Sequence, residues 1–240
     1  MIKYGIMSTA SIAPRYVAGI KESDKGEVVA IASRGIEKAK EFADKYDIPK
    51  YYGSYEELVE DEEIDVIYIP TVNALHYEHA RRALAHHKHV IVEKPFTVNK
   101  AQAEALFDYA RAQNCFLMEA QKIVFLPATE KTIELLESGV IGELKYIELK
   151  AGHPNRFDYS QLMFDVKMGG GALYGSATYT IEYMQHVFKN PKLVMHASKV
   201  NAPTGTDDLC TFTMVMNDKV MVTNPIAMNA PLENDAVFSG

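Results

Sequence analysis

The strongest constraint on the fold is a regular alternation of short apolar runs and helical patterns along the first 120 residues. The apolar runs span 2–7, 28–32, 65–69, 89–92 and 115–118, with a briefer one at 50–52. Helical patterns separate them, and Ser54, Glu57 and Asn99 have the spacing of helix caps. Strands that are apolar on both faces and alternate with helices are typical of a parallel sheet covered on both sides. The sequence therefore predicts an α/β, Rossmann-like dinucleotide-binding domain over residues 1–120.

The pattern changes after Glu119. A helix is predicted over 127–138, and strand patterns then predominate at 144–151, 193–200, 209–216 and 220–226. This order predicts a C-terminal α+β domain over residues 121–240 with an open, mainly antiparallel sheet. Residues 236–240 resemble the middle of a strand, which would leave a sheet edge exposed. We therefore expect that the natural C-terminus is missing or that a partner chain covers this edge.

Composition excludes several classes of protein. The net charge is −7 and no dense basic run is present, which argues against a nucleic-acid partner. No apolar stretch approaches the roughly 20 residues that span a bilayer, and no signal-peptide pattern precedes the first strand. The two cysteines, Cys115 and Cys210, indicate a reducing compartment without a disulfide framework. We expect a cytoplasmic protein whose partner is a small molecule.

A turn of small residues follows the first predicted strand. The positions of a G-x-G-x-x-G motif fall on Ser8, Thr9, Ala10, Ser11, Ile12 and Ala13, so Ser or Ala occupies each glycine position. Small side chains let the backbone approach a pyrophosphate at a helix N-terminus, although the freedom at positive φ is lost. The pattern alone is weak, and its place between a strand and a helix strengthens it. We expect Ser8, Thr9, Ala10 and Ile12 to bind a dinucleotide.

The second predicted strand ends at Ser33 and Arg34. An NAD enzyme usually carries an acidic residue there for the ribose hydroxyls. A hydroxyl and a guanidinium suit a 2′-phosphate instead, so the sequence favours NADP as cofactor, with NAD as a possible second cofactor. The alternative is that Arg34 is an ordinary solvated surface residue.

The fifth predicted strand, 89–92, is followed directly by Glu93, Lys94 and Pro95. In open α/β sheets, ligands bind beyond the carboxyl ends of the strands, so a lysine there can reach a bound substrate. Pro95 fixes the backbone at that point and permits a cis peptide bond. The alternative is that Lys94 only pairs with Glu93 or with solvent.

Together these residues resemble the glucose–fructose oxidoreductase/inositol dehydrogenase (Gfo/Idh/MocA) family, and within it the dihydrodiol and xylose dehydrogenase-like branch. The segments that carry the resemblance are 5–10, 53–57, 70–76, 93–95, 118–120 and 169–173. The resemblance implies hydride transfer between NADP or NAD and a secondary hydroxyl or carbonyl of a sugar, cyclitol or trans-dihydrodiol. It also implies a C-terminal domain that binds this substrate and forms homodimers or homotetramers through its sheet.

The resemblance also assigns residues to roles. It places Lys94 beside the nicotinamide and the substrate hydroxyl, where its ammonium would polarise or help to deprotonate that hydroxyl. Tyr179 holds the position of the proton donor. The cofactor contacts that it implies are Ser8, Ala10, Ile12, Arg34, Thr71, Asn73, His76, Glu93, Pro95 and Met118.

Two departures from the family pattern lie in the second half. Gly175 stands where an Asp is expected four residues before the donor, and Lys122 and Val124 stand where an aromatic residue and an Arg are expected. Loss of an orienting carboxylate can cost orders of magnitude in rate. The alternative function is therefore a non-catalytic, nucleotide-binding sensor or regulatory protein on the same fold.

Histidines cluster in sequence around the fifth predicted strand. His76 and His79 share one helix face, but no set of Cys or carboxylate residues completes a metal site, so we predict none. His76 is expected to shape the cofactor cleft and His79 to be a surface or packing residue. His153 and residues 155–158 belong to a predicted loop that could overhang a substrate or be a solvated connection.

Overall fold

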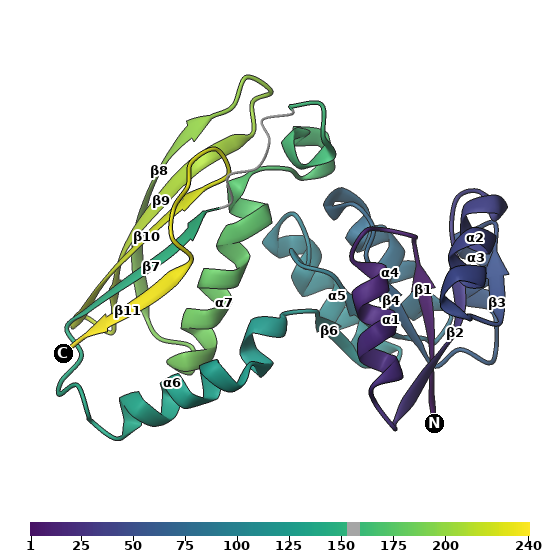
Figure 1. Cartoon of the computed structure of the whole chain (residues 1–240), viewed down its shortest axis with the longest axis horizontal. Helices are drawn as coiled ribbons and strands as arrows, with labels where there is room; N and C mark the ends of the chain where they lie inside the picture. Colours follow the sequence, from purple (N-terminus) through teal and green to yellow (C-terminus); the bar gives the residue numbers. More distant parts are fainter. Residues whose placement is uncertain (153–158) are drawn as a thin grey trace. The chain divides into compact units, whose positions relative to one another are not determined.

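The computed structural model describes residues 1–152 and 159–240. It divides into two compact units, Met1–Ala120 and Gln121–Gly240 (Figure 1). The first unit is an α/β unit built on a parallel sheet and the second is built on a mixed sheet, so the predicted fold class is confirmed.

The first unit contains a six-stranded parallel sheet in the order β3-β2-β1-β4-β5-β6. Its strands are β1 (Ile2–Met7), β2 (Gly26–Ala32), β3 (Lys50–Tyr52), β4 (Val66–Ile69), β5 (His89–Val92) and β6 (Leu117–Glu119). Its helices are α1 (Ala13–Lys21), α2 (Ile36–Tyr46), α3 (Tyr55–Glu60), α4 (His76–Ala85) and α5 (Lys100–Ala112), with a 3₁₀ turn, η1 (Asn73–Leu75). The strands match the predicted apolar runs to within two residues at either end.

Neighbouring residues of one strand pack into different cores, which explains the continuous apolar runs. Ile6 of β1 belongs to a core with residues of α1 and α2, such as Val17. Met7, the next residue, belongs to a second core with residues of α3, α4 and α5, such as Leu58 and Leu106. Because side chains alternate between the two faces of a strand, a sheet with helices on both faces needs apolar residues at successive positions.

The predicted helix caps of this unit are present. The Ser54 hydroxyl accepts a hydrogen bond from the Glu57 amide at 3.2 Å, and the Glu57 carboxylate accepts one from the Ser54 amide at 3.0 Å. The Asn99 side chain accepts a hydrogen bond from the Gln102 amide at 2.9 Å. These contacts satisfy first-turn amides that have no partner within the helix, so α3 and α5 begin where the local sequence requires.

The second unit contains a five-stranded sheet among its described residues, in the order β11-β7-β10-β9-β8. The strands are β7 (Tyr146–Gly152), β8 (Leu193–Asn201), β9 (Asp207–Met216), β10 (Val220–Ala227) and β11 (Asp235–Ser239). All neighbouring strands are antiparallel except β7 and β10, which are parallel. Asn217 and Asp218 form the β9–β10 hairpin turn with φ of 51° and 59°, as a two-residue type I′ turn requires.

Helices cover one face of this sheet. They are α6 (Pro127–Glu137) and α7 (Thr178–Val187), and Figure 1 shows α7 running along the sheet. Met184 and Val187 of α7 pack in one core with Ile147, Phe212 and Val222 of the strands. Short helical turns that the sequence did not predict precede the two helices: η2 (Lys122–Phe125), η3 (Leu162–Phe164), η4 (Val166–Met168) and η5 (Leu173–Ala177). Such short pieces have no apolar periodicity by which a sequence reveals them.

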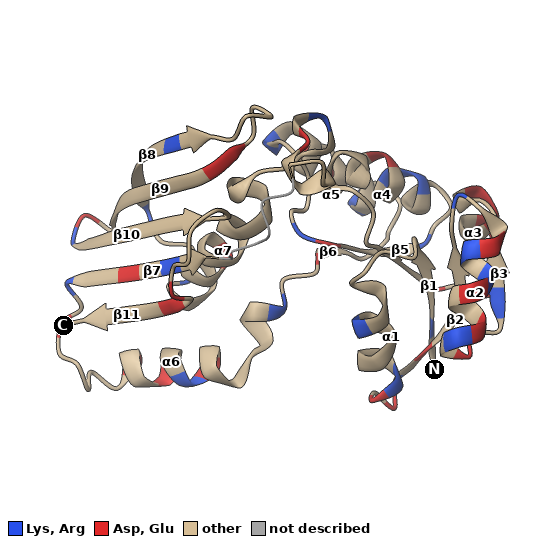
Figure 2. Cartoon of the chain, turned by 45° about the horizontal axis from the view of Figure 1, so that its top comes forward, with Lys and Arg blue, Asp and Glu red and all other residues tan. Residues whose placement is uncertain are grey.

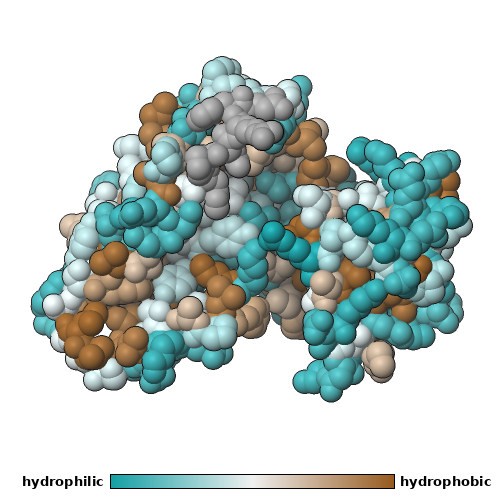
Figure 3. All heavy atoms as spheres, in the orientation of Figure 1, coloured by the Kyte–Doolittle hydropathy of each residue, from teal (hydrophilic) through white to brown (hydrophobic). Residues whose placement is uncertain are grey.

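Hydrophobic and charged side chains are distributed differently on the surface. Figure 3 shows hydrophobic side chains gathered near the C-terminus, at the edge of the second unit where Leu135, Val140 and Val237 are exposed. Figure 2 shows Lys interspersed with Asp and Glu along α2, where pairs such as Lys40 with Asp44 form. Among the described residues, no helix has the length and apolar character to cross a membrane.

The glycine-rich segment before η5 provides a test of the packing. Gly171 has φ of +122°, and a Cβ at this position would overlap the Asp207 carboxylate. That carboxylate accepts a hydrogen bond from the Leu173 amide at 2.7 Å. We expect Gly171→Ala to lower the free energy of unfolding by about 3 kcal/mol, because strain at positive φ adds to overpacking.

The measurement is urea unfolding followed by circular dichroism, with Gly175→Ala as the matched control. The nearest atom to a Cβ on Gly175 would be the Met228 sulfur at 4.0 Å, and residue 175 is helical. The control should therefore be neutral or slightly stabilising. Equal unfolding midpoints for the Gly171→Ala variant and the wild type would contradict the described packing.

Candidate functional site

The residues predicted to bind a cofactor lie at one edge of the parallel sheet. Ser8 follows β1, Arg34 follows β2, Thr71 follows β4 and Lys94 follows β5. The strands are parallel, so their carboxyl ends share an edge, to which Met118 of β6 also belongs. Strand order reverses between the adjacent strands β1 and β4, and such switch points are where open α/β sheets bind ligands.

The turn after β1 leads into a helix N-terminus that carries no negative charge. Ser8 has φ of +130°, a conformation that favours glycine, so this turn holds the backbone of a non-glycine residue in a strained conformation. The N-cap residue Ile12 forms no side-chain cap, and the first turn of α1 contains no acidic residue. The Ala13 amide already donates to the Ala10 carbonyl at 2.9 Å, and Pro14 has no amide hydrogen. The segment 8–13 therefore fits a pyrophosphate through its small side chains and the positive end of the helix dipole.

Ser33 and Arg34 differ in exposure. The Ser33 residue is only 7% exposed, and its amide donates a hydrogen bond to the Tyr52 carbonyl at 3.1 Å. Arg34 is exposed. Its positive charge contributes to the lowered pKa of His79, so the two side chains are neighbours. Of the pair that the sequence singled out, Arg34 is therefore the one whose side chain is accessible.

The segment 93–96 is held from several sides. The Lys94–Pro95 peptide bond is cis. The Tyr68 hydroxyl donates a hydrogen bond to Glu93 Oε1 at 2.6 Å, and Glu93 Oε2 accepts one from the Lys94 amide at 3.2 Å. The Phe96 amide donates to Glu119 Oε1 at 2.9 Å. Two carboxylates therefore fix the backbone on either side of the cis peptide.

The Tyr68 side chain that holds Glu93 is itself fixed. It is 1% exposed in the core of the first unit. The Tyr16 ring of α1 stacks on the Tyr68 ring with a centroid separation of 3.8 Å and an interplanar angle of 5°. Helix α1, which follows the turn after β1, thus also supports the end of β5 through the rings of Tyr16 and Tyr68.

His76 lies behind the cofactor-binding surface. It is 0% exposed, and its two ring nitrogens lie 2.8 Å from the Pro95 carbonyl oxygen and 3.0 Å from the Thr71 carbonyl oxygen. Burial lowers the pKa of His76, and the hydrogen bonds to the two carbonyls oppose that effect. Its imidazole links the loop after β4 to the cis proline, so His76 can act on a cofactor only through these segments.

His79 is a residue that the sequence analysis treated as surface or packing. Its Nδ1 lies 3.0 Å from the Thr71 hydroxyl, and its ring lies edge-on to Tyr55. Burial lowers the pKa of His79 to about 4, and the charge of Arg82 adds to that effect. The spacing of His76 and His79 on one helix face was the available signal. Among the described residues, no group of His, Cys, Asp and Glu could hold a metal ion.

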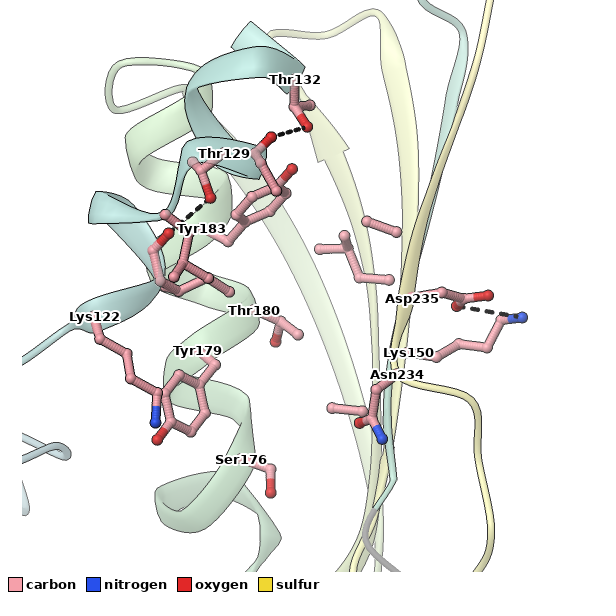
Figure 4. A pocket seen from close by; sticks show the side chains of 16 residues that line it. Lys122, Thr129, Thr132, Lys150, Ser176, Tyr179, Thr180, Tyr183, Asn234 and Asp235 are labelled. Atoms are coloured by element: carbon pink, nitrogen blue, oxygen red, sulfur yellow. Dashed lines mark hydrogen bonds and ion pairs between the residues drawn. The ribbon is translucent and has the colours of Figure 1, made fainter. Parts of the chain in front are cut away.

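In the second unit, Tyr179 of α7 lies at a pocket of about 500 Å³. The Lys122 ammonium lies 5.6 Å from the centroid of the Tyr179 ring, and Figure 4 shows the two side chains together. The pocket is formed by α6, α7, η2 and strands β7 and β11 of this unit alone. Its lining residues are Lys122, Ile123, Leu126, Ala128, Thr129, Thr132, Leu149, Lys150, Ala151, Ser176, Tyr179, Thr180, Tyr183, Asn234, Asp235 and Ala236.

The two departures from the family pattern have different consequences. At Gly175, the nearest described atom to an added Cβ, apart from the backbone of its own helix, would be the Met228 sulfur at 4.0 Å. Lys122 brings a cation to Tyr179, whereas Val124 does not line this pocket. His153 and residues 155–158, which the sequence analysis placed in a loop, lie outside the described residues.

The chain is similar to known oxidoreductases along its whole length. Residues 2–121 match the "Oxidoreductase family, NAD-binding Rossmann fold" model, and residues 129–239 match the GFO/IDH/MocA C-terminal domain. Trans-1,2-dihydrobenzene-1,2-diol dehydrogenase of Xenopus laevis is 34% identical over 242 residues, which cover 99% of this chain and 72% of that protein. The human enzyme of the same name is 33% identical over 243 residues, which cover 100% of this chain and 72% of that protein.

Solved structures show the same similarity. A 3-ketoreductase from Actinomadura kijaniata, solved in complex with NADP and TDP-benzene, has a TM-score of 0.93 and 28% identity, covering 100% of this chain and 74% of that one. An aldose–aldose oxidoreductase from Caulobacter crescentus has a TM-score of 0.90 at 22% identity, covering 100% and 74% respectively, and shows the shared fold. The predicted nicotinamide-binding Rossmann domain is therefore confirmed.

The buried His79 makes the stability of the protein depend on pH. Because the pKa of His79 is about 4 in the folded state and near 6.5 when unfolded, only the unfolded chain gains a proton between these values. Stability is thus full above pH 6.5 and falls as the pH drops toward 4. We expect His79 to contribute a loss of about 2 kcal/mol between pH 8 and pH 5.

Urea titrations of wild type and His79→Gln at both pH values measure this contribution. The difference between the two pH values should shrink by about that amount in the variant. His87→Asn, a change at an exposed histidine with φ of 56°, should leave it unchanged. A His79→Gln variant with the wild-type pH dependence would show that His79 is not a buried neutral imidazole.

Proposed function

The chain belongs to the Gfo/Idh/MocA oxidoreductase family, and from that premise we propose that it is an NADP-preferring dehydrogenase acting on a CH–OH group. The substrate class is a sugar, a cyclitol or a trans-dihydrodiol. The named activities of its relatives, a trans-dihydrodiol dehydrogenase and a 3-ketoreductase, support this class. The observation that carries the proposal is the rigid support of Lys94 at the carboxyl end of β5.

Lys94 is the proposed catalytic residue of the first unit. When NADP(H) is bound, it supplies the hydride acceptor or donor. In the oxidation, the Lys94 side chain would act as a neutral amine that accepts the proton of the substrate hydroxyl as the carbon–hydrogen bond breaks, and it would become an ammonium. In the reduction, the same ammonium would donate a hydrogen bond to the carbonyl oxygen on which negative charge develops. Both roles need a fixed Lys94 side chain, which the hydrogen bonds around residues 93–96 support.

Tyr179 is the proposed proton donor or acceptor of the second unit. Its position on α7, beside a cation and a pocket of suitable size, supports this role. The Actinomadura ketoreductase has also been solved with a single tyrosine replaced by Phe and with a single lysine replaced by Ala. These are the two residue types to which we assign catalysis in this chain.

The proposed cofactor contacts follow from the sheet edge. Ser8, Thr9, Ala10 and Ile12 would hold the pyrophosphate, and Arg34 the 2′-phosphate. The remaining contacts would come from Ser33, Thr71, Asn73, His76, Glu93, Pro95 and Met118, with the buried Ser33 and His76 acting through their neighbours. The exposed Arg34 and the uncapped N-terminus of α1 support NADP, which also occupies the Actinomadura structure.

The proposed assembly is a homodimer or homotetramer formed through the five-stranded sheet, in the cytoplasm. Strand β8 lies at one edge of this sheet and is exposed along nearly its whole length. It carries Val194, Met195 and Val200, which are 48%, 48% and 56% exposed. Apolar side chains on an exposed sheet favour a covering partner, and a second copy of the chain is the partner that we propose.

A nucleotide-binding sensor is the second candidate function. Gly175 favours it, because no carboxylate is available at the position one helical turn before Tyr179. Cofactor binding by the first unit would then regulate a partner without chemistry. Turnover separates the two functions, whereas cofactor binding alone does not.

The first test of the enzyme is Lys94→Ala. We expect NADP-linked oxidation of polyols or dihydrodiols, followed at 340 nm, to fall by roughly 10²- to 10⁴-fold, as for loss of a general acid–base group. The fluorescence-measured Kd for NADPH should stay within about threefold. Lys100→Ala, which removes an exposed lysine of α5, should change neither quantity. Tight NADPH binding with no turnover on any such substrate in the wild type would support the sensor instead.

The second test concerns the cofactor. Replacing Arg34 with Asp removes a partner of the 2′-phosphate and adds a repelling charge. We expect the Kd for NADPH to rise by about 10- to 100-fold and that for NADH to change little. Lys38→Asp makes the same charge change on the exposed face of α2 and serves as the control. Equal effects of the Arg34 change on both nucleotides would refute the NADP assignment.

A further inference from the structure

We propose that the pocket of the second unit binds an anionic substrate, an alicyclic alcohol that carries a carboxylate, and that Lys122 recognises this carboxylate. The inference deepens the proposed function and rests on it, because it names the charge class of the substrate for the same site. It follows from how the charges and polar groups of the pocket are paired.

Two lysines line the pocket, and among the described residues they differ in their ion pairs. The Lys150 ammonium lies 3.2 Å from Glu148 and 3.6 Å from Asp235. Lys122 is exposed and forms no ion pair with any residue in 1–152 or 159–240. The Lys122 ammonium instead lies over the face of the Tyr179 ring. Figure 4 shows Lys122 and Tyr179 at one end of the pocket and the Lys150–Asp235 pair on the sheet side.

Most other polar groups of the lining are already engaged in hydrogen bonds within the protein. The Thr129 hydroxyl donates to the Ile123 carbonyl at 2.7 Å, and the Thr132 hydroxyl donates to the Ala128 carbonyl at 2.8 Å. The Asn234 amide exchanges two hydrogen bonds with the backbone of Gly152, at 2.9 and 3.0 Å. These groups are poorly suited to select the charge of a ligand, so charge selection falls to Lys122.

The rest of the pocket suits an apolar ring. Ile123, Leu126, Leu149 and Ala151 contribute hydrophobic walls, and a volume of about 500 Å³ is in the range of small-molecule sites. The Thr180 hydroxyl is uncharged and already engaged, because it donates a hydrogen bond to the Ala177 carbonyl and accepts one from the Asn224 amide. A ligand with a compact apolar ring and an anionic group at one end would therefore match a pocket with hydrophobic walls and Lys122 at one end.

The position of Lys122 also relates charge to chemistry. Its ammonium lies 5.6 Å from the centroid of the Tyr179 ring, so a ligand carboxylate bound to Lys122 also lies on the Tyr179 side of the pocket. A secondary hydroxyl on that side would lie within reach of the proposed proton donor. Position 175, four residues before Tyr179, holds a glycine and therefore adds no negative charge to η5.

The test compares two ligands of equal shape and different charge. These are trans-4-hydroxycyclohexanecarboxylate and its carboxamide, titrated calorimetrically into the full chain saturated with NADP⁺ at low ionic strength. We expect the carboxylate to bind about fivefold more tightly, a modest ratio because a charge pair at a pocket mouth is partly screened. The preference should shrink in 0.5 M KCl.

Variants identify the group responsible. Lys122→Gln should abolish the preference by weakening the carboxylate and leaving the carboxamide unchanged. Lys199→Gln, at an exposed lysine of β8, should preserve it. The proposal is overturned by equal affinity for both ligands, by no binding of the carboxylate at 50 mM, or by a preference that survives in Lys122→Gln. Binding needs no turnover, so these outcomes are distinct from those of the Lys94→Ala and NADPH measurements.

Discussion

The hydrogen bond between the Tyr68 hydroxyl and the Glu93 carboxylate, at 2.6 Å, connects the core of the first unit to its chemistry. It joins a fully buried ring to a half-buried carboxylate at the end of β5. Hydrogen bonds to an ionised group are short and strong, so Glu93 has a defined position. The Glu119 carboxylate accepts a hydrogen bond from the Phe96 amide, and the His76 ring contacts the Pro95 carbonyl. The Lys94 backbone is consequently part of the core and not a loop on its surface.

This arrangement ties cofactor binding to the folding of the sheet. The Tyr16 ring that stacks on Tyr68 belongs to α1, whose N-terminus follows the turn at Ser8–Ile12. His76 binds carbonyls from the loops after β4 and β5, so a change in one loop is transmitted to the other. The residues that would touch phosphate and those that would touch nicotinamide are thus supported by one set of buried aromatic and polar side chains.

In the second unit, the candidate catalytic residue lies on a helix and not at the end of a strand. Tyr179 lies on α7, and the packing of Met184 and Val187 against the sheet fixes that helix. The Asn224 side chain, 0% exposed, donates a hydrogen bond to Thr180 at 2.6 Å and so links β10 to the same helix. Near Tyr179 the structure places the Lys122 ammonium, 5.6 Å from the centroid of the Tyr179 ring.

Local sequence was sufficient to predict the main strands and helices, the parallel sheet and the small-residue turn, but not the short helical turns η2–η5. The predicted features depend on local periodicity, on capping residues such as Ser54 and Asn99, and on apolar strands. The sequence also identified Lys94 and Arg34 as candidates from their places after strands. It did not reveal that His76 and Ser33 are buried, that His79 contacts Thr71, or that Tyr68 holds Glu93. Nor did it show that Lys122 lies over the Tyr179 ring. These facts depend on contacts between residues distant in the chain, and only tertiary packing decides which polar groups lose solvent and which partners they meet.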